Sequence, residues 1–344
     1  MDFHRAFQFV LTDASAQGVD ALVVVGDILD STRPNSHTIG LLKHLNEVAV
    51  NLKLLVLCTS GNHDKSKPSW IDIITTAGSP YGLRVLDNKT HTLEKDGQKL
   101  KITGLPYYQP QDLREILPTL AGTDVLLWHG DVKEFGNFNE DAITCEELSK
   151  APAKLILLGD IHKREYLEVN QKLIGYPGAT ELCKSNEPED HSYELFEIDL
   201  PSGHIDHRPI EIPTRRVIRA KNVQSQAEAD ELVALIRSAA ASEPMVFIEH
   251  TEAVKGLRER ILSILPEDAI VSVRKIPKYI NMMSSMEIDD KGLEPKDFVK
   301  HFFDPGTTAF DTAVELTRHD VHVPDVLEQF IERRMNEITQ AKAN

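Results

Sequence analysis

The sequence predicts an α/β protein in which a central β-sheet sandwich is flanked by helices. Apolar runs of strand length alternate with segments of helical periodicity through the first half of the chain, and hairpin-like strands follow. In addition, four apolar runs each end on Asp, Asn or His. This pattern is typical of buried parallel strands that deliver side chains at the carboxyl edge of an open sheet.

The elements follow from periodicity and from turn residues. Residues 3–17 have apolar side chains at helical spacing and end at Gly18. After this helix we expect strands at 20–25, 53–58, 84–87, 100–105, 124–129 and 154–159, and helices at 37–50, 69–77 and 111–120. A hairpin turn is expected at Asp96-Gly97, and antiparallel strands at 172–176, 192–199 and 205–211.

The character of the chain changes near residue 212, which divides it into predicted domains. Residues 1–211 form the main domain, and 212–277 form a small αβαβ unit with helices at 225–240 and 253–264 and strands at 245–250 and 269–275. An extension of the main domain is the alternative interpretation of that unit. Residues 278–306 are a polar connection, and two helices are expected within 307–344.

Composition bounds the class of protein. The 344 residues are 41% apolar and 27% charged, as in soluble globular proteins. No run approaches 18 apolar residues and no signal peptide opens the chain, so we expect a cytoplasmic protein that does not contact membranes. The three cysteines are widely spaced, which favours buried thiols over bridges or ligands.

Four motifs carry the chemistry, and each directly follows an apolar run. They are Gly26-Asp27-Ile28-Leu29-Asp30, Gly61-Asn62-His63-Asp64, His129-Gly130 and Gly159-Asp160-Ile161-His162. Carboxylate, amide and imidazole groups are ligands for Mn²⁺, Fe or Zn²⁺ and do not form a thiolate site. The four strand ends together predict a metal site.

This order of motifs resembles the calcineurin-like metallophosphoesterases. A narrower resemblance, to the SbcD-type nuclease subunit of a double-strand-break repair complex, is carried by Asp2–Phe7, Gly26–Ser31 with Arg33-Pro34, Gly159–Arg164 and Tyr176–Glu181. It extends over about residues 1–200. It implies a β-sandwich nuclease domain, followed by a small cap domain that contacts DNA.

The resemblance also implies two divalent metal ions, with Mn²⁺ favoured. Asp27 is the candidate bridging carboxylate; Asn62, His129 and Asp160 would complete one metal shell, and His162 would belong to the other. Asp160 and His162 are two residues apart, so an extended segment projects both to one side. Relatives usually have histidine where this chain has Asp160.

Further residues are assigned by their place beside these motifs. His63 takes the family role of stabilising the transition state and protonating the leaving oxygen. Asp64 either orients His63 or caps the next helix, and Asp30 supports the site from behind. Three basic side chains are candidate phosphate contacts, although each also fits a solvated surface: Arg33, Lys163 and Arg164.

The N-terminus departs from the family pattern. Relatives begin with a strand that ends in the motif D-x-H, which supplies two metal ligands. Asp2-Phe3-His4 has the same pattern of residues. We assign these residues to the first helix instead, because no strand and loop fit before it. We therefore expect the first strand and its ligands to be absent, through a truncated or misassigned start, and one metal site to be incomplete.

The function that the resemblance implies is that of a metal-dependent DNA exonuclease and single-strand endonuclease in DNA repair and recombination. DNA, an SbcC-type ATPase and a second copy in a homodimer are the expected partners. A net charge of −16 argues against an autonomous tight DNA binder. A phosphoesterase for phosphoproteins or small phosphodiesters, and a non-catalytic scaffold, are the alternatives.

The last predicted helix carries an apolar stripe at helical spacing. Its residues are Leu327, Ile331, Met335 and Ile338. Such a stripe packs either on its own domain or on a partner. The family resemblance favours a partner, because a segment at this place docks on the coiled-coil root of the ATPase.

Overall fold

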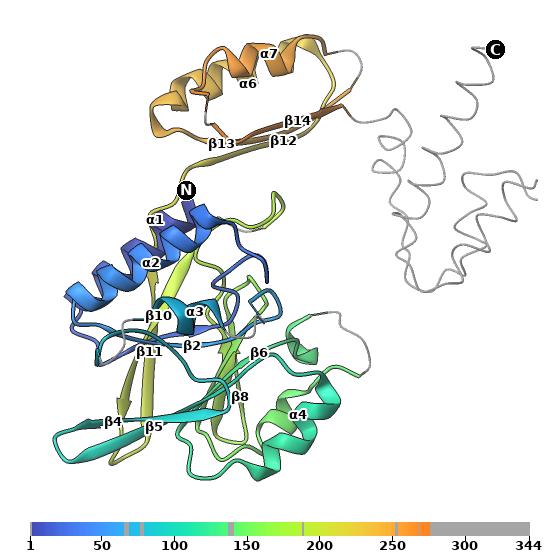
Figure 1. The fold of residues 1–344 in the computed structure, drawn as a ribbon. Coiled ribbons are helices and arrows are strands. Elements are labelled where there is room, and N and C mark those ends of the chain that lie inside the picture. Colours follow the sequence, from blue (N-terminus) through green and yellow to red (C-terminus); the bar gives the residue numbers. More distant parts are fainter. Residues whose placement is uncertain are drawn as a thin grey trace, which may run out of the picture. The chain divides into compact units, whose positions relative to one another are not determined.

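A computed structural model describes seven stretches of the chain: 2–64, 69–75, 79–136, 141–187, 189–251, 254–267 and 269–275 (Figure 1). The chain divides into two compact units. The first comprises residues 1–219, 233–247 and 258–272, and the second comprises 220–232, 248–257 and 273 onwards. All of the predicted site residues belong to the first unit.

The first sheet has three parallel strands in the order β1-β2-β3. These are β1 (Leu22–Val25), β2 (Leu55–Thr59) and β3 (Gly82–Val85). Three helices pack on one face of the sheet: α1 (Asp2–Ala16), α2 (Ser36–Asn51) and α3 (Trp70–Ile74). The side chain of Asn35 caps α2 by accepting a 2.9 Å hydrogen bond from the amide of Thr38.

The second sheet has six strands in the order β4-β5-β6-β7-β9-β8. Its strands are β4 (Lys89–Lys95), β5 (Gln98–Leu105), β6 (Val125–His129), β7 (Leu155–Gly159), β8 (Glu165–Val169) and β9 (Lys172–Tyr176). The central strands from β5 to β9 are parallel, and both edges are antiparallel. Parallel strands place their carboxyl ends at one edge, where the motifs lie.

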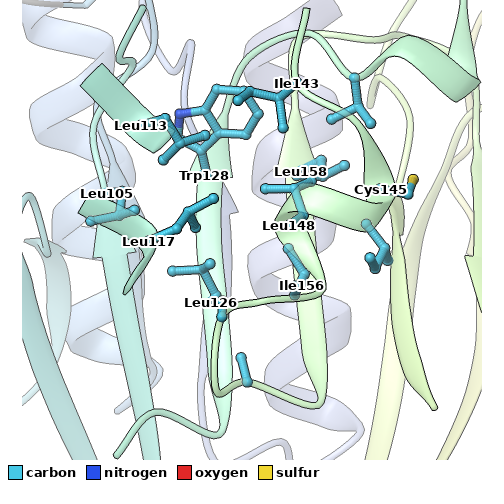
Figure 2. Packing of buried hydrophobic residues seen from close by; sticks show 14 of the residues in the cluster. Leu105, Leu113, Leu117, Leu126, Trp128, Ile143, Cys145, Leu148, Ile156 and Leu158 are labelled. Atoms are coloured by element: carbon cyan, nitrogen blue, oxygen red, sulfur yellow. The ribbon is translucent and has the colours of Figure 1, made fainter. Parts of the chain in front are cut away.

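Side-chain alternation explains how the layers form. In β6, Val125 and Leu127 pack toward the first sheet, against a cluster that includes Leu55 and Leu57 of β2. The alternate residues Leu126 and Trp128 pack on the other side, beneath α4 (Pro110–Ile116) and α5 (Cys145–Leu148). Figure 2 shows Trp128 beside Leu113 and Ile143 in this second cluster. The result is two sheets face to face with helices outside them.

The remaining strands form two smaller sheets. An antiparallel pair consists of β10 (Ser192–Asp199) and β11 (His204–Glu211). A three-stranded sheet in the order β12-β13-β14 contains β12 (Val217–Val223), β13 (Met245–His250) and β14 (Val271–Lys275). Between these strands come α6 (Gln226–Ala239), a 3₁₀ turn at Ala240–Ser242 and α7 (Leu257–Leu262). Two further 3₁₀ turns lie at Leu117–Thr119 and Lys133–Phe135.

The structure confirms the predicted fold class and corrects several elements. The helix expected at 111–120 ends at Ile116 and continues as the 3₁₀ turn that contains Pro118, because proline cannot donate the next helical hydrogen bond. The strands β8 and β12 were not predicted, since charged residues interrupt their apolar pattern. Residues 212–277 therefore contain elements in the order βαβαβ, where αβαβ was expected. The expected linker and C-terminal helices lie outside the described residues.

One buried ion pair ties the loop after β7 to β10. The Arg164 guanidinium donates to both carboxylate oxygens of Glu194, at 2.6 and 2.8 Å, and the Glu194 side chain is only 1% exposed. His207 makes a further contact to the same carboxylate at 2.7 Å. This geometry accounts for the buried charge.

We predict that Arg164→Leu destabilises the fold by about 3–5 kcal/mol, because it leaves the carboxylate of Glu194 buried without its main partner. The neighbouring Lys163→Leu is the matched control. Lys163 pairs with Glu165 at 2.7 Å on the surface, and an exposed pair contributes at most ~1 kcal/mol. Urea unfolding measures both; equal losses in the two variants would contradict the assignment.

Candidate metal centre

Four strand ends converge on one site. Asp27 follows β1, Asn62 and His63 follow β2, His129 ends β6, and Asp160 follows β7. The strands β1 and β2 belong to one sheet, and β6 and β7 belong to the other. The carboxyl edges of both sheets therefore supply the site together.

His129 is the centre of this arrangement. Its side chain is 1% exposed, and its Nδ1 lies 2.8 Å from the carbonyl oxygen of Val25. Because a carbonyl only accepts, Nδ1 carries the proton and donates it. The other ring nitrogen, Nε2, then faces Asp27 Oδ2 at 3.3 Å, Asn62 Oδ1 at 3.1 Å and Asp160 Oδ1 at 3.7 Å.

These atoms suit a divalent cation. Ligand atoms of Asp27, His129 and Asp160 all lie within 4.8 Å of one another. The side-chain oxygen of Asn62 faces the Asp27 carboxylate and His129. If the amide were rotated by half a turn, its nitrogen would instead donate hydrogen bonds to both, at 3.1–3.2 Å. A cation among these atoms would bind the oxygen in its present orientation. Hard oxygen donors with one oriented imidazole fit Mn²⁺ and similar ions.

The charges of Asp27 and His129 are coupled. Burial disfavours the ionised form of Asp27, but the hydrogen bond and positive charge of His129 outweigh it, so the pKa of Asp27 falls below its usual value. Burial likewise opposes the charged form of His129, and the Asp27 carboxylate reverses this, so the pKa of His129 is raised. The backbone amide of His63 also donates to Asp27, at 3.1 Å.

Asp160 is held in an unusual backbone conformation. Its φ angle is 108°, and that of Asp27 is 51°, both in the region that glycine prefers. Such conformations are costly and concentrate at functional sites. Burial, together with the neighbouring carboxyl group of Asp160, raises the pKa of Asp131 to about 6. Asp131 was not predicted as a site residue from the sequence, although it stands two residues after His129.

Two glycines allow this close approach. A Cβ atom on Gly26 would overlap the imidazole of His129, and one on Gly61 would overlap the carboxylate of Asp27. Each glycine in the Gly26-Asp27 and Gly61-Asn62 motifs therefore makes room for a site residue from another strand.

Asp64 has a different role from both of those expected. One of its carboxylate oxygens accepts from the amide of Ile28, at 2.9 Å, and the other accepts from the amide of Gly61. The cap of α3 is Ser69, which corrects the capping interpretation. Burial, and next the charge of Asp27, raise the pKa of Asp64 to about 6. Asp64 thus joins the turn after β1 to the turn after β2.

His63 lies at the exposed side of the site. Its Nδ1 is 3.1 Å from the backbone carbonyl oxygen of Asp30. Through this contact Asp30 supports the site, with its main chain instead of its carboxylate. This contact orients the His63 ring, and no ion pair of its side chain is found in the described part of the chain.

His162 does not join Asp27 in this structure. Its Nδ1 lies 2.6 Å from Glu187 Oε1, and His162, Cys183 and Glu187 form a separate group of potential ligand atoms within 4.8 Å of one another. The other oxygen of Glu187 accepts from the amides of Cys183 and Lys184. Neither Cys183 nor Glu187 was singled out from the sequence, because no motif spacing marks them.

Two of the basic candidates form ion pairs with acidic side chains. Arg164 is engaged by Glu194, and Lys163 pairs with Glu165 on the surface. Arg33 lies in an exposed turn in which its own amide donates to the Ser31 hydroxyl at 3.1 Å. Their role as phosphate contacts stays a prediction.

Asp2 and His4 lie in α1, as expected. Asp2 accepts a 2.9 Å hydrogen bond from Arg215, and the ring of His4 stacks on His44 at 5.5 Å. Neither residue belongs to either group of potential metal ligands in the described chain.

A protein-family model matches the part of the chain that contains these motifs. Residues 2–164 match the family model of the calcineurin-like phosphoesterases. The match spans all four motifs, from Asp27 to His162, and confirms the resemblance that these motifs carry.

Relatives with related sequences are known from archaea. The chain is 31% identical over 230 residues to the "DNA double-strand break repair protein Mre11" of Methanosarcina acetivorans, covering 63% of this chain and 36% of that protein. It is 26% identical over 288 residues to the protein of the same name from Halobacterium salinarum, covering 79% and 64%. The chain thus spans between about a third and two thirds of these relatives.

Solved structures give weaker matches. The protein TT1561 of Thermus thermophilus aligns with a TM-score of 0.41 at 12% identity, over 59% of this chain and 92% of that one. A "novel archaeal phosphodiesterase" aligns with a TM-score of 0.33 at 14% identity, over 60% and 92%. Among the described residues, no helix combines the length and the apolar character needed to cross a membrane.

We predict that the chain binds about one Mn²⁺ per molecule at micromolar free metal, and that His129→Gln weakens this binding at least about tenfold, since even the outer partners of a metal ligand contribute that much. The control is His204→Gln, because His204 is an exposed residue of β11. Calorimetric titration measures both. Unchanged affinity in His129→Gln, or two tight sites in the parent chain, would contradict the assignment.

Proposed function

We propose that this chain is a metal-dependent DNA nuclease of the SbcD and Mre11 type, which hydrolyses phosphodiester bonds. The observation that carries the proposal is the convergence of Asp27, Asn62, His129 and Asp160 on one point, with His63 beside them. The similarity to archaeal proteins named for double-strand break repair supports DNA as the substrate.

The residues of the site have different proposed roles, which follow from their positions. Asp27, Asn62, His129 and Asp160 would hold a divalent ion, for which Mn²⁺ is the best candidate. When bound, such an ion would supply a nucleophilic hydroxide at neutral pH and would neutralise charge on the phosphoryl oxygens. Val25 keeps the imidazole of His129 oriented through its carbonyl. Asp64 fixes the two turns that carry Asp27 and Asn62.

His63 is the proton donor of the proposal. It follows Asn62 directly, its own amide binds Asp27, and its side chain is on the open side of the site. With Nδ1 donating to the carbonyl of Asp30, the neutral ring has no proton on Nε2, so His63 would protonate the leaving oxygen from Nε2 as the imidazolium. An imidazole is suited to this task because its pKa is near neutrality.

The net charge of the chain affects how tightly it can bind DNA by itself. A net charge of −16 opposes tight binding of duplex DNA by the chain alone, because Lys and Arg contacts to phosphate supply most of that affinity. A partner with a basic surface would remove this obstacle, and an SbcC-type ATPase is the candidate. Residues 307–344, which we expect to dock on that ATPase, lie outside the described part of the chain, and a homodimer stays a prediction.

We predict that His63→Ala lowers Mn²⁺-dependent cleavage of linear DNA by about 10²–10⁴-fold, which is the usual contribution of a general acid, while metal content is unchanged. His204→Ala is the control for a histidine outside the site. Gel assays on double- and single-stranded DNA measure the rate, and elemental analysis measures the metal. Metal loss in His63→Ala would show a ligand role instead. Metal binding by the parent chain without cleavage would favour the non-catalytic scaffold.

A further inference from the structure

His162 is held at two points by the segment that follows β9. Its main-chain carbonyl accepts a 2.9 Å hydrogen bond from the amide of Ala179, and its ring nitrogen Nδ1 lies 2.6 Å from Glu187 Oε1. A Cβ atom on Gly178 would stand 3.0 Å from that carbonyl oxygen, and the φ angle of Gly178 is 85°, which suits glycine. Both the backbone and the ring of His162 are therefore fixed by one connecting segment.

The carboxylate of Glu187 is itself held in place. Its second oxygen, Oε2, accepts from the amides of Cys183 and Lys184, at 2.8 and 2.9 Å, and the Glu187 side chain is only 12% exposed. A carboxylate with two amide donors on one oxygen is ionised at neutral pH and acts as an acceptor at the other. Nδ1 of His162 is consequently the donor in the 2.6 Å contact, and the neutral ring keeps its lone pair on Nε2.

Arg219 of β12 anchors the turn that contains Glu187. Its guanidinium donates to the main-chain carbonyls of Ser185 and Glu187, at 2.6 and 2.9 Å, and forms an ion pair with Glu189. Three contacts from one planar group restrain the turn. The position of the Glu187 carboxylate is thus set by the backbone around it and does not depend on His162.

The separation of His162 and Glu187 is that of a hydrogen bond. Nitrogen and oxygen ligands of one tetrahedral ion stand about 3.4 Å apart, given metal–ligand distances of about 2.0–2.2 Å. The observed 2.6 Å is shorter and fits a charge-assisted N–H···O bond. The Cys183 thiol has a partner of its own, the carbonyl oxygen of Glu181 at 3.5 Å. These contacts describe a histidine with a fixed acceptor better than a closed metal site of His162, Cys183 and Glu187.

The ring of His162 has another side, which belongs to the metal centre. Asp27, His129, Asp160 and His162 line one cavity, and Glu187 is not among the described residues that line it. Glu187 therefore lies behind the ring as seen from the cavity. Because the two ring nitrogens point in different directions, Nε2 points away from Glu187 and remains for the cavity side.

We propose that Glu187 is a positioning residue of the metal centre. It holds His162 in the tautomer that carries its proton on Nδ1, so that Nε2 can bind a second, weakly held divalent cation. A carboxylate behind a histidine ligand also makes the ligand nitrogen more basic. His129 has the same tautomer, since its Nδ1 donates to Val25. The inference rests on the proposed function only in taking His162 as a metal ligand.

The substitution Glu187→Gln reverses the direction of this hydrogen bond. The single oxygen of glutamine would stay with the amides of Cys183 and Lys184, because these donors need an acceptor. Its NH₂ group would then face Nδ1 of His162, which must accept, and the ring proton would move to Nε2. The variant keeps the size of the side chain and changes the tautomer.

The first test follows the histidine ring nitrogens by ¹⁵N NMR in the metal-free full chain, with His162→Gln to assign the signals of His162. We expect the neutral ring to carry its proton on Nδ1 in the parent chain and on Nε2 in Glu187→Gln. Glu189→Gln is the matched control, because Glu189 belongs to the same segment and contacts Arg219 instead of His162. A proton on Nε2 in the parent chain, an unchanged tautomer in Glu187→Gln, or the same change in Glu189→Gln would overturn the proposal.

The second test is a titration with Zn²⁺, a diamagnetic ion that imidazole binds. Zn²⁺ should shift the Nε2 signal of His162 in the parent chain, and Glu187→Gln should need at least about tenfold more metal for the same shift. A shift at Nδ1 would show that His162, Cys183 and Glu187 bind the ion together, and no shift at either nitrogen would show that His162 is not a ligand. Either result would overturn the proposal.

Neither test involves DNA cleavage. A chain that gives the expected tautomers and the expected Zn²⁺ shifts but cuts no DNA would refute the proposed function and leave the role of Glu187 intact. A chain that cuts DNA while His162 fails either test would do the reverse.

Discussion

The hydrogen bond from His129 Nδ1 to the carbonyl of Val25 connects the two sheets at the point where their strands end. Its 2.8 Å length and near-complete burial fix the plane of the imidazole and the position of its proton. Nε2 then faces Asp27, Asn62 and Asp160, whose oxygen atoms lie 3.1–3.7 Å from it. The orientation of one ring thus turns four separate strand ends into a single site.

The carboxylates gathered around His129 favour a positive charge at the site. Asp27 and Asp160 both point toward His129, and Asp131 and Asp64 stand close behind them. The Asp27 carboxylate raises the pKa of His129 against the effect of burial, and burial together with neighbouring carboxylates raises the pKa values of Asp64 and Asp131. A divalent ion would compete with protons for these groups, so metal binding should release protons from the site.

Much of the site followed from the sequence because strand ends are local features. An apolar run followed by Gly-Asp or Gly-Asn-His-Asp can be recognised without knowing what lies across the sheet, and parallel pairing then brings such ends together. For the same reason the assignment of Asp2 and His4 to a helix was sound: residues 3–17 have a continuous helical period.

Other features depend on contacts between distant residues, which no local pattern records. Asp64 looked like a helix cap, but its partners are the amides of Ile28 and Gly61. Glu187 binds His162 from 25 positions away, and Arg164 is matched to Glu194 only by the packing of β10. The strands β8 and β12 escaped prediction because half-exposed strands carry charges that blur their alternation.

The measurement that tests the account most directly is anomalous diffraction at the manganese edge, from crystals of the chain grown with MnCl₂. The account predicts a peak within coordination distance of His129 Nε2 and of oxygen atoms from Asp27, Asn62 and Asp160, with the His129 Nδ1 bond to Val25 retained. A peak at His162, Cys183 and Glu187 alone, or none near His129, would contradict it.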